Sequence, residues 1–373
     1  MDIMDTSKPN VSEEQVKDLA LSIFDLTVTS IKKMVSFDDQ NFHIKVSKNH
    51  KNPHIKDICI DGYTLKITNT VKSATSGHFD SMHRAMIHFN KKGLRVPLPV
   101  RNMDGKTWKM VQVPVLNKGK NGVSTDDPCG IHLLTFLPGV TVSTQPYTSS
   151  ILFQWGALLA QFHNAAQDYS CPIMAEKDIF WNLEHVPEII NFMDGLEDER
   201  RALILNILNL YPENIAQKLP ELPKGFIHGD FNENNILVQL KTTSDCDASV
   251  DGILDFDDMH FGTYAWDVGM MLAYTLLDCK TMDPLEGAGH ALAGYLSRRQ
   301  LCSLELSVLK MCISCRLAQS LVLSAYSHRL DPSNAYLLSS AKTGWDRLEQ
   351  VWNTENESLL NKWKGIQNLY IQS

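Results

Sequence analysis

The chain of 373 residues is 43% hydrophobic and 21% charged, and its formal net charge is −8 at pH 7. This length predicts about two to three domain-sized units, and the composition is typical of a globular protein rather than a disordered one. The acidic balance argues against general nucleic-acid binding, which depends on a basic surface.

The sequence shows no membrane-spanning segment, signal peptide or transit peptide pattern. No uninterrupted apolar run reaches the roughly 18 residues needed to span a bilayer. The N-terminal sequence MDIMDTSKPN lacks the apolar core of a signal peptide and the arginines of a transit peptide. We therefore expect a cytoplasmic protein without a membrane partner, in which the eight cysteines are reduced thiols.

The first part of the chain is predicted to be rich in strands. Ser12 and Gln15 form a capping box, which predicts a helix start. A second helix should bury Phe79, Met82, Met86 and Phe89 on one face. Gly93 is expected to end that second helix. The predicted strands cover residues 27–35, 41–46, 58–68, 111–115 and 131–137.

The pattern changes to helices after the turn signal Pro138-Gly139. Apolar side chains at helical spacing predict one helix through residues 151–162 and another near 203–208. We therefore expect an α+β fold with a strand-rich first half, a connector near 134–139 and a mostly helical second half. Further helices are predicted over residues 264–277, 286–298, 303–328 and 334–352.

The stretch from Phe226 to Met259 contains the strongest chemical motif. In FIHGDFNENNILV, Asp230 and Asn235 stand five positions apart, and after a polar loop the run VDGIL leads to Asp255. A carboxylate and an amide oxygen can share a Mg²⁺ ion, which prefers oxygen ligands. Asp255 and Asn235 are thus candidate metal ligands, and Asp230 is a candidate base that orients or deprotonates an attacking hydroxyl group.

Three residues of the strand-rich half are candidates for binding a nucleotide. Lys66 lies in a predicted strand well before the motif, as a lysine that contacts the α- and β-phosphates would. Asp80 could pair with that lysine, or could simply favour the start of its helix through the dipole. Ser36 opens a glycine-free turn, Ser36 to Gln40, which stands where a phosphate-covering loop would lie or is a solvated turn.

The chain resembles the aminoglycoside phosphotransferase family of small-molecule kinases, which share the protein-kinase-like fold of two lobes. The broad likeness rests on HGDFNENNIL, and further likeness lies in SFDDQNFH, LTFLPG, WNL, GILDFDDM and AKTGW. The resemblance implies a nucleotide-binding lobe over residues 1–135 and a catalytic and substrate-binding lobe over 136–373. It also implies that Leu134 to Leu137, with Thr135, forms the hinge that takes the purine.

The same resemblance implies transfer of the γ-phosphoryl group of GTP, or ATP, to the hydroxyl group of free 5-hydroxy-L-lysine, with Mg²⁺ as cofactor. Such a substrate carries two ammonium groups and one carboxylate. Asp258 could meet an ammonium or cap a turn. Arg316 could bind the carboxylate through its guanidinium or pair with a structural acid. Trp181 could line the pocket or belong to the core.

Two positions depart from the family pattern, and they leave alternatives open. Asp80 stands where a glutamate is expected, and Asp257 stands where a glycine usually follows the Asp-Phe pair. An aspartate at position 257 could adopt the left-handed backbone of that glycine. The alternatives are a related kinase for an aminoglycoside, choline or homoserine, and a pseudokinase that binds nucleotide without catalysis.

Overall fold

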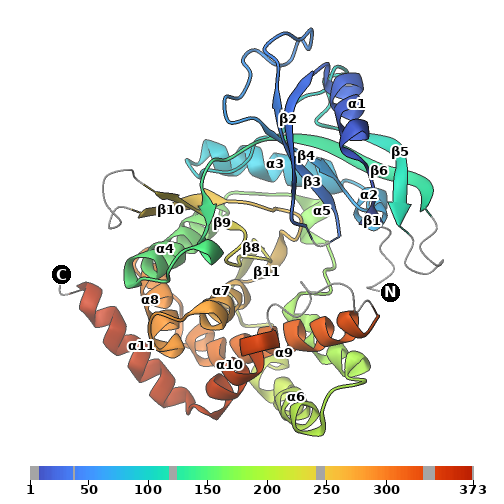
Figure 1. The fold of residues 1–373 in the computed structure, drawn as a ribbon. Helices are drawn as coiled ribbons and strands as arrows, with labels where there is room; N and C mark the ends of the chain where they lie inside the picture. Colours follow the sequence, from blue (N-terminus) through green and yellow to red (C-terminus); the bar gives the residue numbers. More distant parts are fainter. Residues whose placement is uncertain (1–7, 37, 117–123, 241–247, 331–340, 372–373) are drawn as a thin grey trace. The chain divides into compact units, whose positions relative to one another are not determined.

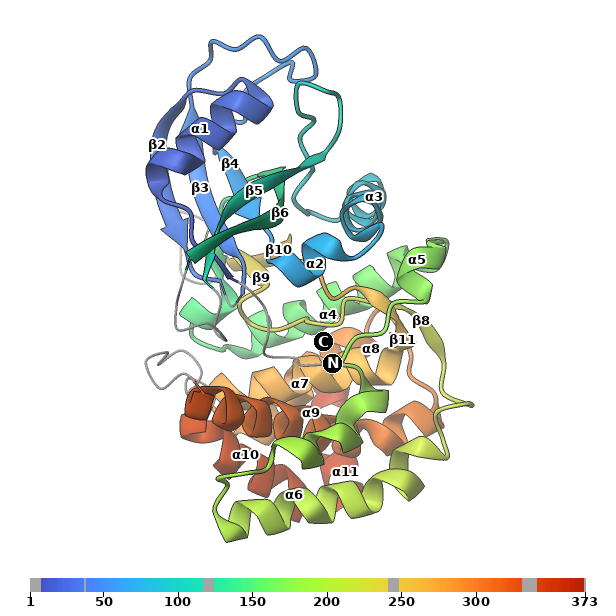
Figure 2. The same ribbon diagram turned by 90° about the vertical axis from the view of Figure 1, so that its right-hand side faces the viewer.

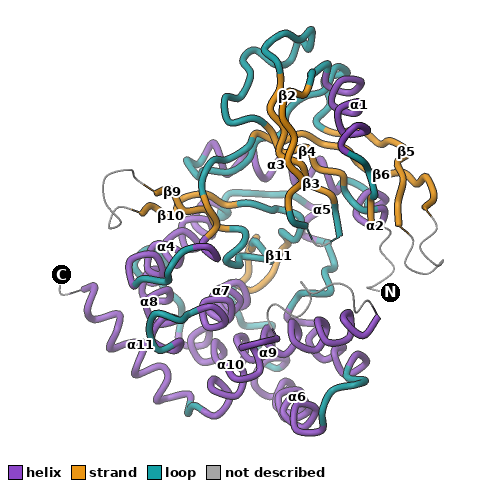
Figure 3. Tube along the Cα trace, viewed as in Figure 1, coloured by secondary structure: helices purple, strands orange, loops and turns teal. Residues whose placement is uncertain are grey.

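The computed structural model describes residues 8–36, 38–116, 124–240, 248–330 and 341–371. It divides into two compact units, Met1–Pro138 and Gly139–Ser373, whereas the sequence predicted a boundary between residues 135 and 136. The first unit is rich in strands and the second is mostly helical, as Figure 3 shows. The predicted α+β class is therefore confirmed.

The first unit is built on a six-stranded sheet in the order β1-β5-β6-β4-β3-β2 (Figure 1). Each pair of neighbouring strands is antiparallel. As in any β-strand, successive side chains point to opposite faces of the sheet. The strands are β1 (Lys8–Pro9), β2 (Val28–Met34), β3 (Gln40–Val46), β4 (Tyr63–Ile67), β5 (Trp108–Leu116) and β6 (Ser124–Thr135).

Helices lie on both faces of this sheet, with α1 (Glu13–Phe24) and α3 (His78–Lys91) on opposite sides (Figure 2). The predicted capping box opens α1, and the predicted apolar face of α3 is buried. Leu65 and Ile67 of β4 join α1 in one core cluster. Lys66 alternates to the other face, and the short helix α2 (Thr70–Ala74) follows β4. Strand β4 begins only at Tyr63, because the chain turns at Gly62.

The second unit combines helices with two small sheets, one in the order β10-β9-β7 and one of β11-β8. Its strands are β7 (Val140–Thr141), β8 (Lys224–Ile227), β9 (Ile236–Leu240), β10 (Ala248–Ile253) and β11 (His260–Thr263). Its α-helices are α4 (Ser149–Ala165), α5 (Pro172–Ala175), α6 (Asp198–Tyr211), α7 (Tyr264–Asp278), α8 (Pro284–Leu296), α9 (Ser303–Leu330), α10 (Ala341–Asn353) and α11 (Asn356–Ile371). The segments η1 (Val142–Thr144) and η2 (Leu183–Phe192) are 3₁₀ helices, and η3 (Pro212–Ala216) is a π helix.

Helices α4 and α8 pack so closely that each needs a glycine at the contact. A Cβ on Gly156 would lie 1.7 Å from the carbonyl oxygen of Ala291, and one on Gly294 would lie 1.8 Å from that of Phe153. This close approach fixes α4 against α8.

Helix α9 runs through the interior of the second unit. Among the described helices it is the one long and apolar enough to cross a membrane, but 78% of its most apolar window is buried inside the protein, as in a core helix. The predicted helix over 334–352 corresponds to α10, with residues 334–340 outside the described part of the chain. The sequence did not predict α11.

Candidate active site

Asp230 lies in the loop between β8 and β9, and two asparagines of the same loop hold its carboxylate. Asn232 donates from Nδ2 to Oδ1 at 2.8 Å, and Asn235 donates from Nδ2 to Oδ2 at 2.8 Å. Each carboxylate oxygen is thus oriented by an amide that follows it by two or five residues. The loop therefore presents Asp230 in a defined direction, as a base that must meet one substrate hydroxyl requires.

The surroundings of Asp230 raise its pKa to about 6. Burial is the main cause, the guanidinium of Arg316 opposes it, and the carboxylates of Asp258 and Asp255 add to it. The side chain remains 26% exposed, so a substrate can still reach it. At neutral pH the group is mostly ionised and can accept a proton.

Asn235 and Asp255 lie side by side, because Leu254 donates its backbone N–H to the carbonyl oxygen of Asn235 at 2.8 Å. The amide nitrogen of Asn235 is engaged by Asp230, which turns its amide oxygen the other way. One amide oxygen and one exposed carboxylate are suitable ligands for a hard divalent cation, whose remaining ligands would be phosphate and water oxygens. Within the described residues, no three His, Cys, Asp or Glu side chains gather to hold a metal by themselves.

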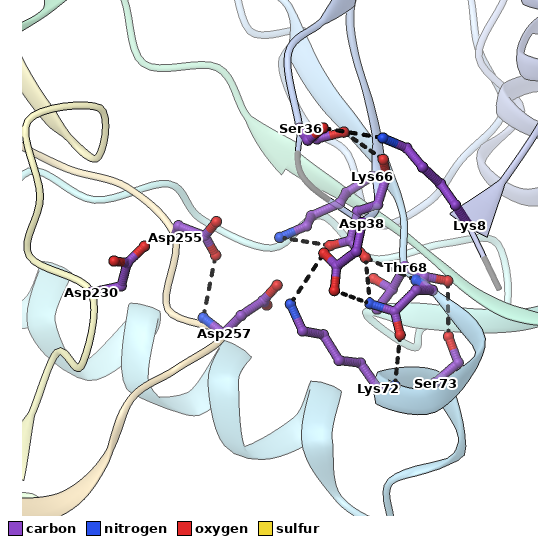
Figure 4. A network of polar contacts seen from close by, with 12 residues as sticks. Lys8, Ser36, Asp38, Lys66, Thr68, Lys72, Ser73, Asp230, Asp255 and Asp257 are labelled. Atoms are coloured by element: carbon purple, nitrogen blue, oxygen red, sulfur yellow. Dashed lines mark hydrogen bonds and ion pairs between the residues drawn. The ribbon is translucent and has the colours of Figure 1, made fainter. Parts of the chain in front are cut away.

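The turn after β10 places its left-handed residue differently from the prediction. The positive φ of 54° belongs to Asp255, and Asp257 does not have one. Asp255 accepts from the Asp257 N–H, so its short polar side chain stabilises the left-handed residue locally (Figure 4). The expectation of a left-handed Asp257 was therefore wrong. Asp257 is buried instead, and Lys177 donates from Nζ to its carbonyl oxygen.

Asp258 holds this turn against the catalytic loop through its backbone. Its carbonyl oxygen accepts from His260 Nδ1 at 2.8 Å, and a Cβ on Gly229 would lie 2.2 Å from it. With its φ of 79°, Gly229 also has a backbone that only glycine adopts easily. The side chain of Asp258 stays partly exposed and close enough to Asp230 to raise its pKa.

The structure brings Arg316 and Trp181 together with Asp230. Arg316 is 4% exposed, and its Nη2 lies 3.6 Å from Asp230 Oδ1. Its guanidinium stacks over the ring of Trp181 at 4.7 Å. Tyr274 and Gln319, which the sequence reading missed, accept from Nη2 at 2.9 Å and from Nη1 at 3.2 Å. The third nitrogen of the guanidinium, Nε, is buried without a hydrogen-bond partner in the described structure.

A buried aspartate of α7, Asp267, anchors the catalytic loop and was also missed. It accepts from the backbone N–H of His228 at 2.9 Å and of Gly229 at 3.1 Å. His163 of α4 donates to it from Nε2 at 3.0 Å and meets Tyr295 through Nδ1 at 2.9 Å. Burial raises the pKa of Asp267, but the hydrogen bonds outweigh it and hold the pKa below its usual range. A lone aspartate inside an apolar helix was the available signal.

In the first unit, the carboxylate of Asp39 lies 3.3 Å from Lys66 Nζ. The predicted partner, Asp80, is an exposed residue in the first turn of α3, and it accepts from Trp108 Nε1 at 3.0 Å. The prediction that Asp80 holds Lys66 therefore differs from the structure. Two consecutive aspartates in a turn next to the lysine strand were the signal that could have indicated Asp39.

Ser36 and Thr135 both have local partners. The hydroxyl of Ser36 donates to the carbonyl oxygen of Asp39, which closes the turn before β3. Thr135, at the end of β6, accepts from the Leu98 N–H through its hydroxyl at 2.9 Å, and its own N–H donates to the Leu98 carbonyl at 2.9 Å. The predicted contacts of Ser36 with phosphate and of Thr135 with a purine stay predictions.

Comparison with known proteins places this arrangement among enzymes that transfer phosphoryl groups. Residues 60–301 match the phosphotransferase enzyme family. The hydroxylysine kinase of Bos taurus is 30% identical over 364 residues, which cover 96% of this chain and 93% of that protein. The hydroxylysine kinase of Xenopus laevis is 30% identical over 378 residues, covering 99% and 97%.

Solved structures agree on the fold. The amicoumacin kinase hAmiN, solved in complex with AMP-PNP, Ca²⁺ and Ami, superimposes with a TM-score of 0.66 over 94% of this chain and 97% of that one. The two sequences are 16% identical, so the likeness shows a shared fold. The predicted protein-kinase-like fold is thereby confirmed.

Proposed function

Because the chain belongs to the phosphotransferase enzyme family, we propose that it transfers the γ-phosphoryl group of GTP to the hydroxyl group of 5-hydroxy-L-lysine. That it is a small-molecule kinase with a hydroxyl acceptor follows from its relatives; the donor, the substrate and Mg²⁺ are the proposal. One observation carries it: the buried cation of Arg316 stands beside Asp230, in a site otherwise rich in carboxylates.

Asp230 acts on the substrate hydroxyl. Its carboxylate accepts a hydrogen bond from that hydroxyl and receives the proton as the oxygen attacks the γ-phosphorus. The bond from this phosphorus to the oxygen that bridges the β- and γ-phosphates breaks, and GDP leaves. Asn232 and Asn235 keep the carboxylate in one orientation during this step. Asp267 keeps the loop itself in place through the N–H groups of His228 and Gly229.

Asn235 and Asp255 would hold the Mg²⁺, through an amide oxygen and a carboxylate oxygen. When bound, the cation neutralises charge on the phosphate oxygens. Lys66 would contact the α- and β-phosphates, and the backbone of residues 134–137 would meet the purine.

We also propose a cytoplasmic location, since the seven cysteines among the described residues are free thiols.

The substrate carboxylate pairs with Arg316 in this proposal. The guanidinium lies beside Asp230, and the face of Trp181 keeps its plane fixed, as a group that binds a carboxylate through two hydrogen bonds requires. Asp258, which is partly exposed beside Asp230, is the candidate partner of a substrate ammonium. A zwitterionic amino acid with a further amine matches this pair of opposite charges better than choline, which has no carboxylate.

The test is a coupled assay of nucleoside-diphosphate release with 5-hydroxy-L-lysine as substrate and with GTP and ATP as donors. Lysine, which lacks the acceptor hydroxyl, is the matched blank. We expect turnover with hydroxylysine, none above background with lysine, and a preference for GTP. Turnover on choline, homoserine or an aminoglycoside, with none on hydroxylysine, would reject the proposed substrate.

A further inference from the structure

We propose that Asp39 is the residue that positions Lys66 for the nucleotide. Asp39, in the turn before β3, then holds the lysine that Asp80 of helix α3 was expected to hold. The inference rests on the proposed function in one respect, since it takes Lys66 to be the phosphate contact.

The two oxygens of the Asp39 carboxylate have separate partners. Oδ1 accepts from Asn69, from its backbone N–H at 2.8 Å and from its Nδ2 at 3.0 Å. Oδ2 faces Lys66 Nζ at 3.3 Å. The side chains of Asp39 and Lys66 are only 4% and 8% exposed. A carboxylate fixed through one oxygen therefore holds the lysine with the other, in a site that water scarcely screens.

Asn69 connects this pair to α2. Its Oδ1 accepts from the Lys72 N–H at 3.0 Å and so caps the helix, while its Nδ2 also donates to Asp38 Oδ2 at 2.9 Å. Lys72 Nζ lies 3.6 Å from Asp38 Oδ1. The turn, the end of β4 and the first turn of α2 thus form one braced unit around Lys66.

The same brace explains how acidic residues can occupy a turn that would cover phosphates. Two carboxylates there would repel a nucleotide if they were uncompensated. Asp38 and Asp39 are each paired with a lysine, Lys72 and Lys66. The turn is therefore close to neutral within this cluster, and Lys66 is held in place before any nucleotide arrives.

The first turn of helix α3 contacts Trp108 of β5. Phe79 stacks on Trp108 with ring centroids 4.8 Å apart, and its ring fills the space that a Cβ on Gly130 would need. Asp80, the next residue, is bound to the same tryptophan. This part of α3 is fastened to β5 and β6 by Phe79, Gly130 and Trp108, and Asp80 belongs to that attachment.

A double-mutant cycle on the full chain tests the inference. The variants are Asp39→Asn, Lys66→Met and their combination, and the measurement is the dissociation constant of a non-hydrolysable GTP analogue and of its ATP counterpart with Mg²⁺. The matched control is the exposed pair Lys109–Asp104, 3.4 Å apart in the same unit, through Asp104→Asn. Thermal unfolding of every variant checks that it is folded.

We expect Asp39→Asn to weaken nucleotide binding about 10- to 100-fold, as misplacing a positioned group does. The combined variant should bind no worse than Lys66→Met alone, because Asp39 acts through the lysine. Asp39→Glu should restore part of the affinity. Asp104→Asn should bind like the wild type.

The inference would be overturned if the effects of Asp39→Asn and Lys66→Met on the dissociation constant were additive. It would also be overturned if the effects of Asp80→Asn and Lys66→Met were not additive, because Asp80 would then act through the lysine. Both outcomes leave the proposed function standing, because the assay contains no amine substrate. Wild-type protein that binds neither analogue would overturn the inference and the proposed function together. Wild-type binding without turnover of hydroxylysine would reject only the proposed substrate.

Discussion

The clusters around Lys66 and Asp230 both consist of carboxylates and cations, yet their charge balance differs. Around Lys66, two carboxylates face two lysines at 3.3 and 3.6 Å. Around Asp230, the carboxylates outnumber the cations, and burial raises the pKa of Asp230 although the guanidinium of Arg316 opposes it. The balanced cluster is suited to holding a geometry. The acidic cluster is suited to receiving a divalent cation, an ammonium group and a proton. Its carboxylates are Asp230, Asp255 and Asp258, and its buried cation is Arg316.

The largest effect should come from removing the base of the acidic cluster. Asp230→Asn should lower kcat on the order of 10³-fold, the contribution typical of a positioned base, while nucleotide affinity stays within about twofold. Nucleoside-diphosphate release and nucleotide titration measure the two quantities. Asp251→Asn, on β10 and bonded to Gln239, is the control with unchanged turnover. Equal turnover of Asp230→Asn and wild type would show that Asp230 is not the base.

The second effect concerns the cation that the acidic cluster is expected to attract. Asp255→Asn should raise the Mg²⁺ concentration needed for half-maximal nucleotide binding at least about tenfold, since disturbing even an outer ligand costs that much. Asparagine is the right replacement, because it tolerates the left-handed backbone at φ 54°. A Mg²⁺ titration of nucleotide binding is the measurement, and an unchanged midpoint would contradict the assignment.

A smaller effect is expected from changing the shape of the cation and keeping its charge. Arg316→Lys should raise the KM for the amino acid about tenfold, which corresponds to losing one charge-assisted hydrogen bond. The KM for the nucleotide should not change. Arg299→Lys is a matched control, since Arg299 also stacks on an aromatic ring, that of Tyr264 at 4.1 Å. Equal KM values for both variants and wild type would exclude Arg316 from substrate binding.

The smallest effect tests the support behind the acidic cluster. Burial lowers the pKa of His163 even beside Asp267, so the folded protein keeps this histidine neutral. The unfolded chain binds the proton more readily, and stability should therefore fall as the pH drops below about 6.5, by up to about 1.4 kcal/mol per pH unit. His163→Gln should flatten this slope between pH 7 and 5 in denaturant unfolding. A slope unchanged by the substitution would show that His163 titrates alike in both states.

Short-range patterns in the sequence predicted much of the fold and the core of the site. The capping box of Ser12 and Gln15 opens α1 as expected, because both partners lie within one helical turn. Asp230 and Asn235 meet because they stand five positions apart in one short loop, whatever surrounds it. The antiparallel hairpin of β9 and β10 then brings Asp255 beside Asn235.

Only the tertiary structure decided which distant partner each charged group has. Lys66 meets Asp39 and not Asp80, because α2 and the turn before β3 close on one face of β4 while Trp108 engages Asp80. Arg316 reaches Asp230 because α9 runs through the interior of its unit. Loop spacing and helix caps depend on a few bonds of the chain. The choice between two carboxylates for one lysine depends on how whole elements pack, which spacing along the sequence does not encode.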